Sequence, residues 1–94
     1  MDYDSFKESL AADHPPPGIS PYLAALWQDA NGDWETAHHI IQDIDDSIAA
    51  EIHAYLHRKE GDLGNADYWY RKAGQKRPGV SLPEEWERIA KKLT

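Results

Sequence analysis

Two glycine–aspartate dipeptides, Gly32-Asp33 and Gly61-Asp62, interrupt long helical patterns in this sequence. Glycine adopts the left-handed conformation that closes a helix at little cost. Aspartate accepts hydrogen bonds from the free backbone amides at the start of the next helix. We therefore expect each dipeptide to end one helix and to begin another. Two helices joined by so short a corner must run antiparallel and pack on each other.

The spacing of apolar residues predicts further helices on both sides of these corners. Ser20-Pro21 supplies a capping residue followed by proline at the first helical position. Ser81 and Glu84 have the spacing of a capping box. The predicted helices cover residues 3–12, 20–30, 34–43, 47–60, 62–76 and 81–94.

These elements predict an all-α fold of about five to six helices, arranged as stacked antiparallel pairs in one domain, residues 1–94. The segment 13–19 contains three successive prolines and is expected to be a rigid linker. The narrow apolar stripe of the last helix is typical of a helix that covers the end of a stack. The domain is thus expected to consist of an N-terminal helix (1–12), a first pair (20–44), a second pair (46–78) and a C-terminal capping helix (81–94).

Composition and charge exclude several classes of protein. The 94 residues include no cysteine, which excludes disulfides, thiol catalysis and cysteine-ligated zinc. The net charge is −7, and residues 1–46 hold ten acidic side chains and one basic one. Nucleic-acid binding needs a basic stripe, and no apolar run approaches the about 18 residues of a membrane span. We therefore expect neither nucleic acid nor membrane as a partner. The first residues lack the pattern of a secretory signal, and we expect a cytoplasmic protein.

The segment 47–60 has the least polar circumference of the predicted helices. Only Glu51 and Arg58 occupy a clearly charged sector. A helix of this kind is buried on most sides, so we expect it in the middle of the stack, with Ala54 at a close helix crossing. The rest of its circumference is formed by Ile48, Ala50, Ile52, His53, Ala54, Tyr55, Leu56 and His57.

The two corners also belong to an internal repeat of helix, tight turn and helix. Neither copy can cover its apolar face alone, so the two pairs are expected to stack. The first copy reads Ala24-x-Leu26 before its corner and Ala37 after it. The second reads Ala54-x-Leu56 and then Ala66, and one residue must be gapped to align them.

The second copy resembles the tetratricopeptide repeat. Ala66, Tyr70, Ala73 and Pro78 stand at the spacings of the second helix of that family, and residues 46–78 give a repeat of 33 residues. The usual aromatic and leucine positions of the first helix hold other residues here, whereas its small-residue position holds Ala54. The whole chain also resembles small bacterial helical proteins to which no function has been assigned.

The resemblance implies binding, because the first helix of each such pair lines a concave surface that holds a peptide or a partner protein. The residues that fall on this surface are Glu51, Tyr55, Arg58 and Lys59. A tyrosine flanked by one acid and two bases can anchor a short peptide by stacking and charge-assisted hydrogen bonds. With two pairs the groove is short, which favours a small partner or a homodimer. The alternative is an ordinary solvated face, with Tyr55 packed in the core.

A second hypothesis concerns His53 and His57, which are four residues apart and lie on one helix face. Zinc sites use this spacing with a third ligand. The candidates for a third ligand are His38, Glu60 and Asp62, and no HExxH motif is present. The alternative is a pair of partly buried, hydrogen-bonded structural histidines.

No nucleotide-binding or hydrolase motif is present. We therefore expect a non-enzymatic protein–protein interaction module that needs no cofactor and no metal. The alternative is a small metal- or ligand-binding protein, or an enzyme, that uses His53 and His57.

Overall fold

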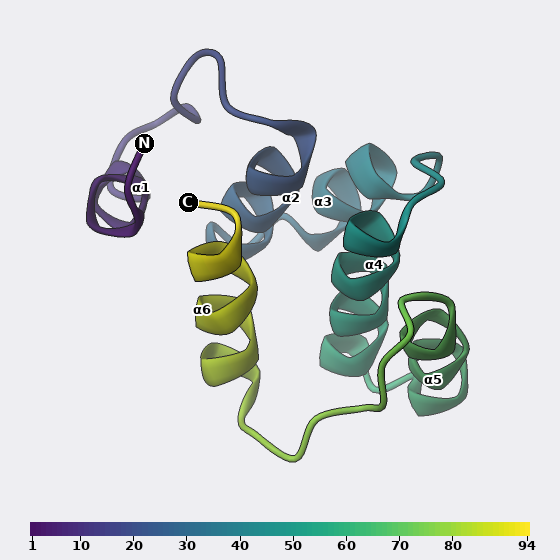
Figure 1. Cartoon of the computed structure of the whole chain (residues 1–94). Helices are drawn as coiled ribbons and strands as arrows, with labels where there is room; N and C mark the ends of the chain where they lie inside the picture. The colour runs from purple at the N-terminus through teal and green to yellow at the C-terminus, as the bar shows by residue number, and fades with distance from the viewer.

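The computed structural model describes residues 1–94 and consists of six α-helices without a strand (Figure 1). This confirms the predicted all-α fold. No helix is both long enough and apolar enough to span a membrane. The helices are α1 (Tyr3–Ser9), α2 (Pro21–Ala30), α3 (Trp34–Ile41), α4 (Ser47–Glu60), α5 (Leu63–Lys72) and α6 (Leu82–Lys92).

Every helix starts after an aspartate or a serine. The side-chain oxygen of this residue accepts a hydrogen bond from the backbone amide three residues later, which stabilises a helix by about 1 kcal/mol. The starts predicted at Ser20, at the two Gly-Asp corners and at Ser81 are therefore confirmed. The six capping residues are Asp2, Ser20, Asp33, Asp46, Asp62 and Ser81.

Both corners have the geometry that the dipeptides predict. Gly32 and Gly61 have φ angles of +85° and +90°, which favour glycine. Their amides donate to the carbonyl three residues earlier at 3.0 and 3.1 Å. The following aspartate amides donate five residues back, each at 2.9 Å. This closure turns the chain sharply, and α2 packs on α3 as α4 packs on α5.

Four helix ends differ from the prediction, and that of α6 lies at Lys92 rather than at residue 94. Helix α5 ends at Lys72 rather than near Lys76, because Gly74, at φ +74°, closes it. The amides of Gly74 and Gln75 donate to carbonyls of the last turn at 3.0 and 2.9 Å. Helix α1 ends at Ser9 rather than at residue 12, and α3 ends at residue 41 rather than 43. After α1, the amides of residues 10–12 donate only three residues back, so the chain continues as turns.

The two helix pairs align without a gap, which corrects the predicted alignment. A constant offset of 29 residues matches the corners and also places Ala25 opposite Ala54 and Ala37 opposite Ala66. All four alanines are fully buried. The small residue of α2 is therefore Ala25 rather than Ala24, which is half-buried.

Helix α4 lies at the centre, as predicted, and packs against α2, α3, α5 and α6. Ala54 is fully buried and contacts Ala66 and Tyr70 of α5. The predicted apolar sector has one exception, since Ile48 in the first turn is 39% exposed. Helices α2 and α6 cover one side of α4, and α3 and α5 cover the other.

Helix α6 packs against α2 and α4, which are the first helices of the two pairs (Figure 1). This position differs from that of a helix that covers the end of a stack. Trp86 anchors it, because this side chain is 6% exposed and its indole N–H donates to the Leu26 carbonyl at 3.0 Å. Phe6 of α1 stacks on Trp86, with ring centroids 5.9 Å apart. The two terminal helices therefore share one apolar anchor.

Candidate metal centre

Three of the five histidines come together between α3 and α4. His53 and His57 lie one turn apart on α4, as their spacing predicts, and His38 of α3 faces them. The Nε2 atoms of His38 and His53 are 3.0 Å apart. One ring nitrogen from each histidine lies within 4.8 Å of the other two. Of the three candidates for a third ligand, His38 completes an all-imidazole cluster, which we call the histidine cluster.

Two tryptophans hold the rings of the histidine cluster in place. Trp34 lies parallel to His38, with centroids 4.9 Å apart and an angle of 7° between the planes. Trp69 of α5 lies parallel to His53 at 3.9 Å and 17°. The Trp34 indole N–H donates to the Leu56 carbonyl at 2.7 Å, which fixes this ring to α4. The imidazoles are therefore confined in orientation as well as in position.

His57 is oriented by a carboxylate. Its Nδ1 atom lies 2.8 Å from Oε1 of Glu60. Because an ionised carboxylate can only accept hydrogen bonds, Nδ1 carries a proton, and Nε2 is the nitrogen whose lone pair the neutral ring would offer to a metal ion. The Asn65 amide lies 3.3 Å from this Nε2 atom. A carboxylate behind a histidine is the arrangement that orients imidazole ligands in metal sites.

Burial favours the neutral form of two of the three rings in the histidine cluster. His53 is 5% exposed, and this burial, together with repulsion from the other two rings, lowers its pKa to about 4. Burial also lowers the pKa of His38, and its neighbours His57 and His39 add to that effect. Neutral imidazole is the form that binds metal ions. His38 and His53 are therefore in the state that a cation needs.

The spacing of the ring nitrogens suits a tetrahedral ion after a small adjustment. Zinc–nitrogen bonds of about 2.0–2.1 Å place neighbouring ligand atoms about 3.3 Å apart. The 3.0 Å separation of the His38 and His53 nitrogens is close to this value. The third nitrogen lies within 4.8 Å of these two, so an ion would have to draw it closer. The donor set fits a bound metal ion.

A second possible donor set shares His57 with Glu60 and Asp62. Both of its carboxylates are exposed, and Glu60 already binds Nδ1 of His57. Groups of exposed acidic side chains are common on protein surfaces that bind no ion. Glu60 thus has a clearer role as the residue that orients His57.

The four residues that the sequence assigned to a binding surface contact other parts of the chain. Both oxygens of Glu51 accept hydrogen bonds from Lys92, at 2.7 and 2.9 Å. Arg58 pairs with Glu85 at 2.7 Å and also donates to the Val80 carbonyl. These contacts join α4 to α6 and to the segment before it.

The other two members of that set contact α2. Tyr55 is 3% exposed and donates to Asp29 at 3.1 Å. Lys59 pairs with the second oxygen of Asp29 at 2.9 Å. Tyr55 is therefore packed in the core, as the alternative interpretation of this face proposed.

Sequence reasoning did not assign Trp34, Trp69 or Asn65 to a site. Trp34 lies four residues before His38, a spacing that places the two rings on one helix face. That spacing is the signal that was available from the sequence. For Trp69 and Asn65 no local pattern exists, because their partners lie on another helix.

No protein-family model, curated protein or solved structure matches this chain. The function therefore has to be inferred from the chemistry of the side chains. None of the five cavities of the molecule is lined by His38, His53 or His57.

Proposed function

We propose that this protein binds a divalent transition-metal ion, with zinc as the first candidate, through His38, His53 and His57. The observation that carries this proposal is the convergence of three imidazoles, with one nitrogen of each within 4.8 Å of the others. Two of these rings are buried and two are stacked on tryptophans. A cluster with this degree of order can bind an ion with little rearrangement.

The donor set determines the class of ion. Imidazole suits zinc, copper, nickel and iron, whereas magnesium and calcium prefer oxygen ligands. Three histidines leave one position of a tetrahedral ion for water or another donor. The amide of Asn65 lies 3.3 Å from Nε2 of His57 and is a polar group beside the proposed site.

Binding without turnover is the form of the proposal that the geometry supports. Trp34 and Trp69 cover His38 and His53, and no histidine of the cluster lines a cavity. A bound ion would connect α3 to α4 and so stabilise the folded chain by mass action. The proposed role is therefore metal-dependent stabilisation, storage or sensing.

Isothermal titration of tag-free protein with zinc chloride tests the proposal. We expect one ion per chain, and an about tenfold or greater loss of affinity in each of His38→Gln, His53→Gln and His57→Gln. The matched control is His39→Gln, since His39 is next in sequence to His38 but exposed and near Gln42. Circular dichroism checks that each variant folds. Equal zinc affinity in all five proteins would remove the proposal.

A protein-interaction role is the second candidate, and the position of α6 favours it. The tetratricopeptide-like interpretation assigns the partner to the surface of α2 and α4, and α6 is seated there. Glu51 and Arg58 contact α6 directly, while Tyr55 and Lys59 line a cavity beside it. The groove thus fits an amphipathic helix with an acidic residue next to a tryptophan, such as α6 of a second copy.

Light scattering over a wide concentration range and a labelled peptide of residues 80–94 test this second candidate. The expected result is a homodimer at high concentration, or peptide binding by the full chain that increases in Trp86→Ala, whose own α6 is loosened. A peptide with Trp86 replaced by alanine is the control. A strict monomer that binds neither peptide contradicts the candidate.

A further inference from the structure

A cavity of about 450 Å³ is lined by residues on or next to α1, α2, α4 and α6. It is the cavity beside α6 that Tyr55 and Lys59 line, and no histidine of the cluster lines it. Its volume is within the range of about 300–1,000 Å³ that is common for small-molecule sites. The apolar part of its wall is formed by Leu10, Ala30, Leu82, Pro83 and Trp86.

The floor of this cavity contains a carboxylate that is already neutralised. Asp29 is 1% exposed, and its two oxygens are engaged by the Tyr55 hydroxyl at 3.1 Å and by Lys59 at 2.9 Å. A cationic ligand would have to displace Lys59 from this pair. The floor therefore offers no free negative charge.

The rim carries two ammonium groups from different helices. Lys7 of α1 lies over the Trp86 ring, 5.8 Å from its centroid, and forms no ion pair. Lys59 of α4 is 38% exposed and has donors left beyond its bond to Asp29. The charged lining residues are Lys7, Lys59 and Asp29, so the net charge of the cavity lining is positive. The whole chain, by contrast, has a net charge of −7. The complementary ligand is an anion with an apolar body.

We propose that this cavity binds a small amphiphilic carboxylate. The apolar body of the ligand lies against Leu10, Leu82 and Trp86, and its carboxylate reaches Lys7 and Lys59. Both ends of the ligand then find matching surfaces, which a purely apolar or a cationic compound does not. The site is independent of the proposed metal centre.

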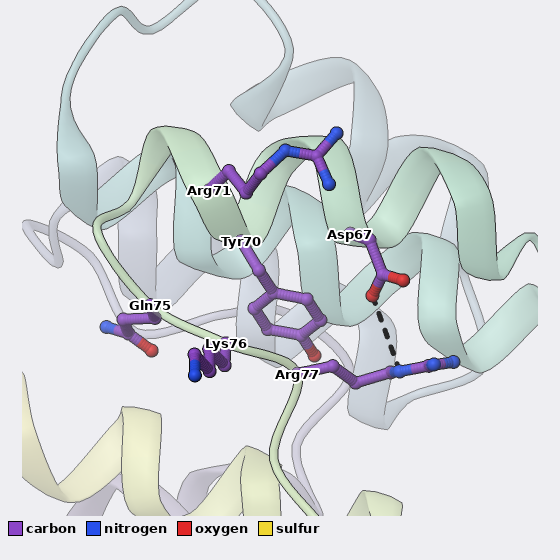
Figure 2. Close-up of a pocket in the computed structure, with 6 residues that line it drawn as sticks. All are labelled: Asp67, Tyr70, Arg71, Gln75, Lys76 and Arg77. Atoms are coloured by element: carbon purple, nitrogen blue, oxygen red, sulfur yellow. Dashed lines mark ion pairs between the residues drawn. The ribbon is translucent and has the colours of Figure 1, made fainter.

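A second cavity, of about 400 Å³ beside α5, is also lined by cationic residues but lacks an apolar wall. Figure 2 shows Arg77 paired with Asp67, at 3.3 Å, beside the ring of Tyr70. Its cationic residues include Lys76, but Tyr70 is its one apolar lining residue. Without an apolar wall, this cavity is expected to have no preference for amphiphilic anions, so Lys76 serves as a control position.

The test is a titration of the full-length protein with octanoate, followed by amide and indole NMR signals. The expected result is saturable shifts at Trp86, Ala30 and Lys59, and binding about tenfold tighter than that of octanol or octylamine. Lys7→Glu is expected to weaken octanoate binding about tenfold, and Lys76→Glu to leave it unchanged. Both lysines are exposed, so neither variant removes a buried group.

Three results would overturn this proposal: equal or tighter binding of octanol or octylamine, shifts confined to other regions, or equal affinity in Lys7→Glu and the wild type. Zinc titration of Lys7→Glu keeps the two sites distinguishable. We expect normal zinc affinity in this variant, and octanoate binding that persists in His57→Gln.

Discussion

The polar groups buried on the two sides of α4 differ in kind. On the side that faces α2 and α6, Arg58 and Lys59 each bind a carboxylate that is almost fully buried. On the side that faces α3 and α5, His53 and His57 are buried against other rings, and no buried acid accompanies them. We call these the ionic side and the histidine side.

The difference shows which polar residues are available to a ligand. A buried charge needs an opposite partner within the chain, so each buried carboxylate of the ionic side is already paired with a cation and is not free to bind a metal ion. A neutral imidazole can be buried with fewer bonds, and the His38 and His53 nitrogens that face each other can share only one proton. A cation would accept both lone pairs. The histidine side therefore has unused capacity for a ligand.

The largest effect is expected on the ionic side, from Glu85→Ala. Glu85 is 3% exposed and accepts hydrogen bonds from Arg58 at 2.7 Å and from Tyr70 at 2.6 Å. Its removal leaves a charge without a partner, which costs about 3–5 kcal/mol of the free energy of unfolding. Urea denaturation measures the loss, and zinc affinity of the folded fraction should be unchanged. A loss below about 1 kcal/mol would show that this pair does not stabilise the fold.

The second-largest effect is expected from low pH, which lowers the free energy of unfolding mainly through the histidine side. The pKa of His53 falls from 6.5 to about 4 on folding, so the unfolded chain binds more protons between these values. Stability is therefore complete above pH 6.5 and falls as the pH drops through this window, by about 3 kcal/mol in total. Urea denaturation of the metal-free protein at several pH values measures it. The control is His53→Gln, in which the slope between pH 6.5 and 5 should be smaller; an equal slope contradicts the assignment.

A smaller effect, on zinc affinity, is expected from Glu60→Ala on the histidine side. Without the carboxylate, Nδ1 of His57 loses its partner and the ring loses its fixed orientation. Zinc affinity should fall about tenfold, which corresponds to about 1.4 kcal/mol. Glu35→Ala, at an exposed acid on α3, is the matched control. If both variants bind zinc like the wild type, Glu60 does not position the ligand.

The smallest effect is expected from Glu51→Gln, on the exposed edge of the ionic side. The Lys92 partner is 55% exposed, and pairs in contact with water contribute less than about 1 kcal/mol. Thermal unfolding at low and high salt measures this pair. A larger, salt-independent loss would mean that the edge is as important to the fold as Glu85.

Local signals made the helix starts and corners predictable. Capping residues and the two Gly-Asp dipeptides act within a few residues of the chain, and all of them have the expected geometry. The end of α5 was missed because Lys76 and Arg77 continue a pattern typical of a helix end, although Gly74 closes the helix first. The alignment of the two pairs was wrong by one residue because Ala24 and Ala25 are equivalent by composition and differ only in burial.

The candidate site was predictable only in part. The i, i+4 spacing placed His53 and His57 together, and His38 was one of three candidates for a third ligand. The choice between them depends on how α3 faces α4, which is set by packing of residues far apart in the sequence. The same holds for Arg58 and Lys59, whose partners Glu85 and Asp29 are 27 and 30 residues away.

The central claim is that the histidine side of α4 holds a metal ion and the ionic side does not. X-ray absorption spectroscopy of the zinc-loaded protein at one ion per chain tests it most directly. The account predicts three imidazole nitrogens at about 2.0–2.1 Å from zinc, in a roughly tetrahedral environment. A spectrum of zinc surrounded by water and carboxylate oxygens, or by a single imidazole, would contradict it.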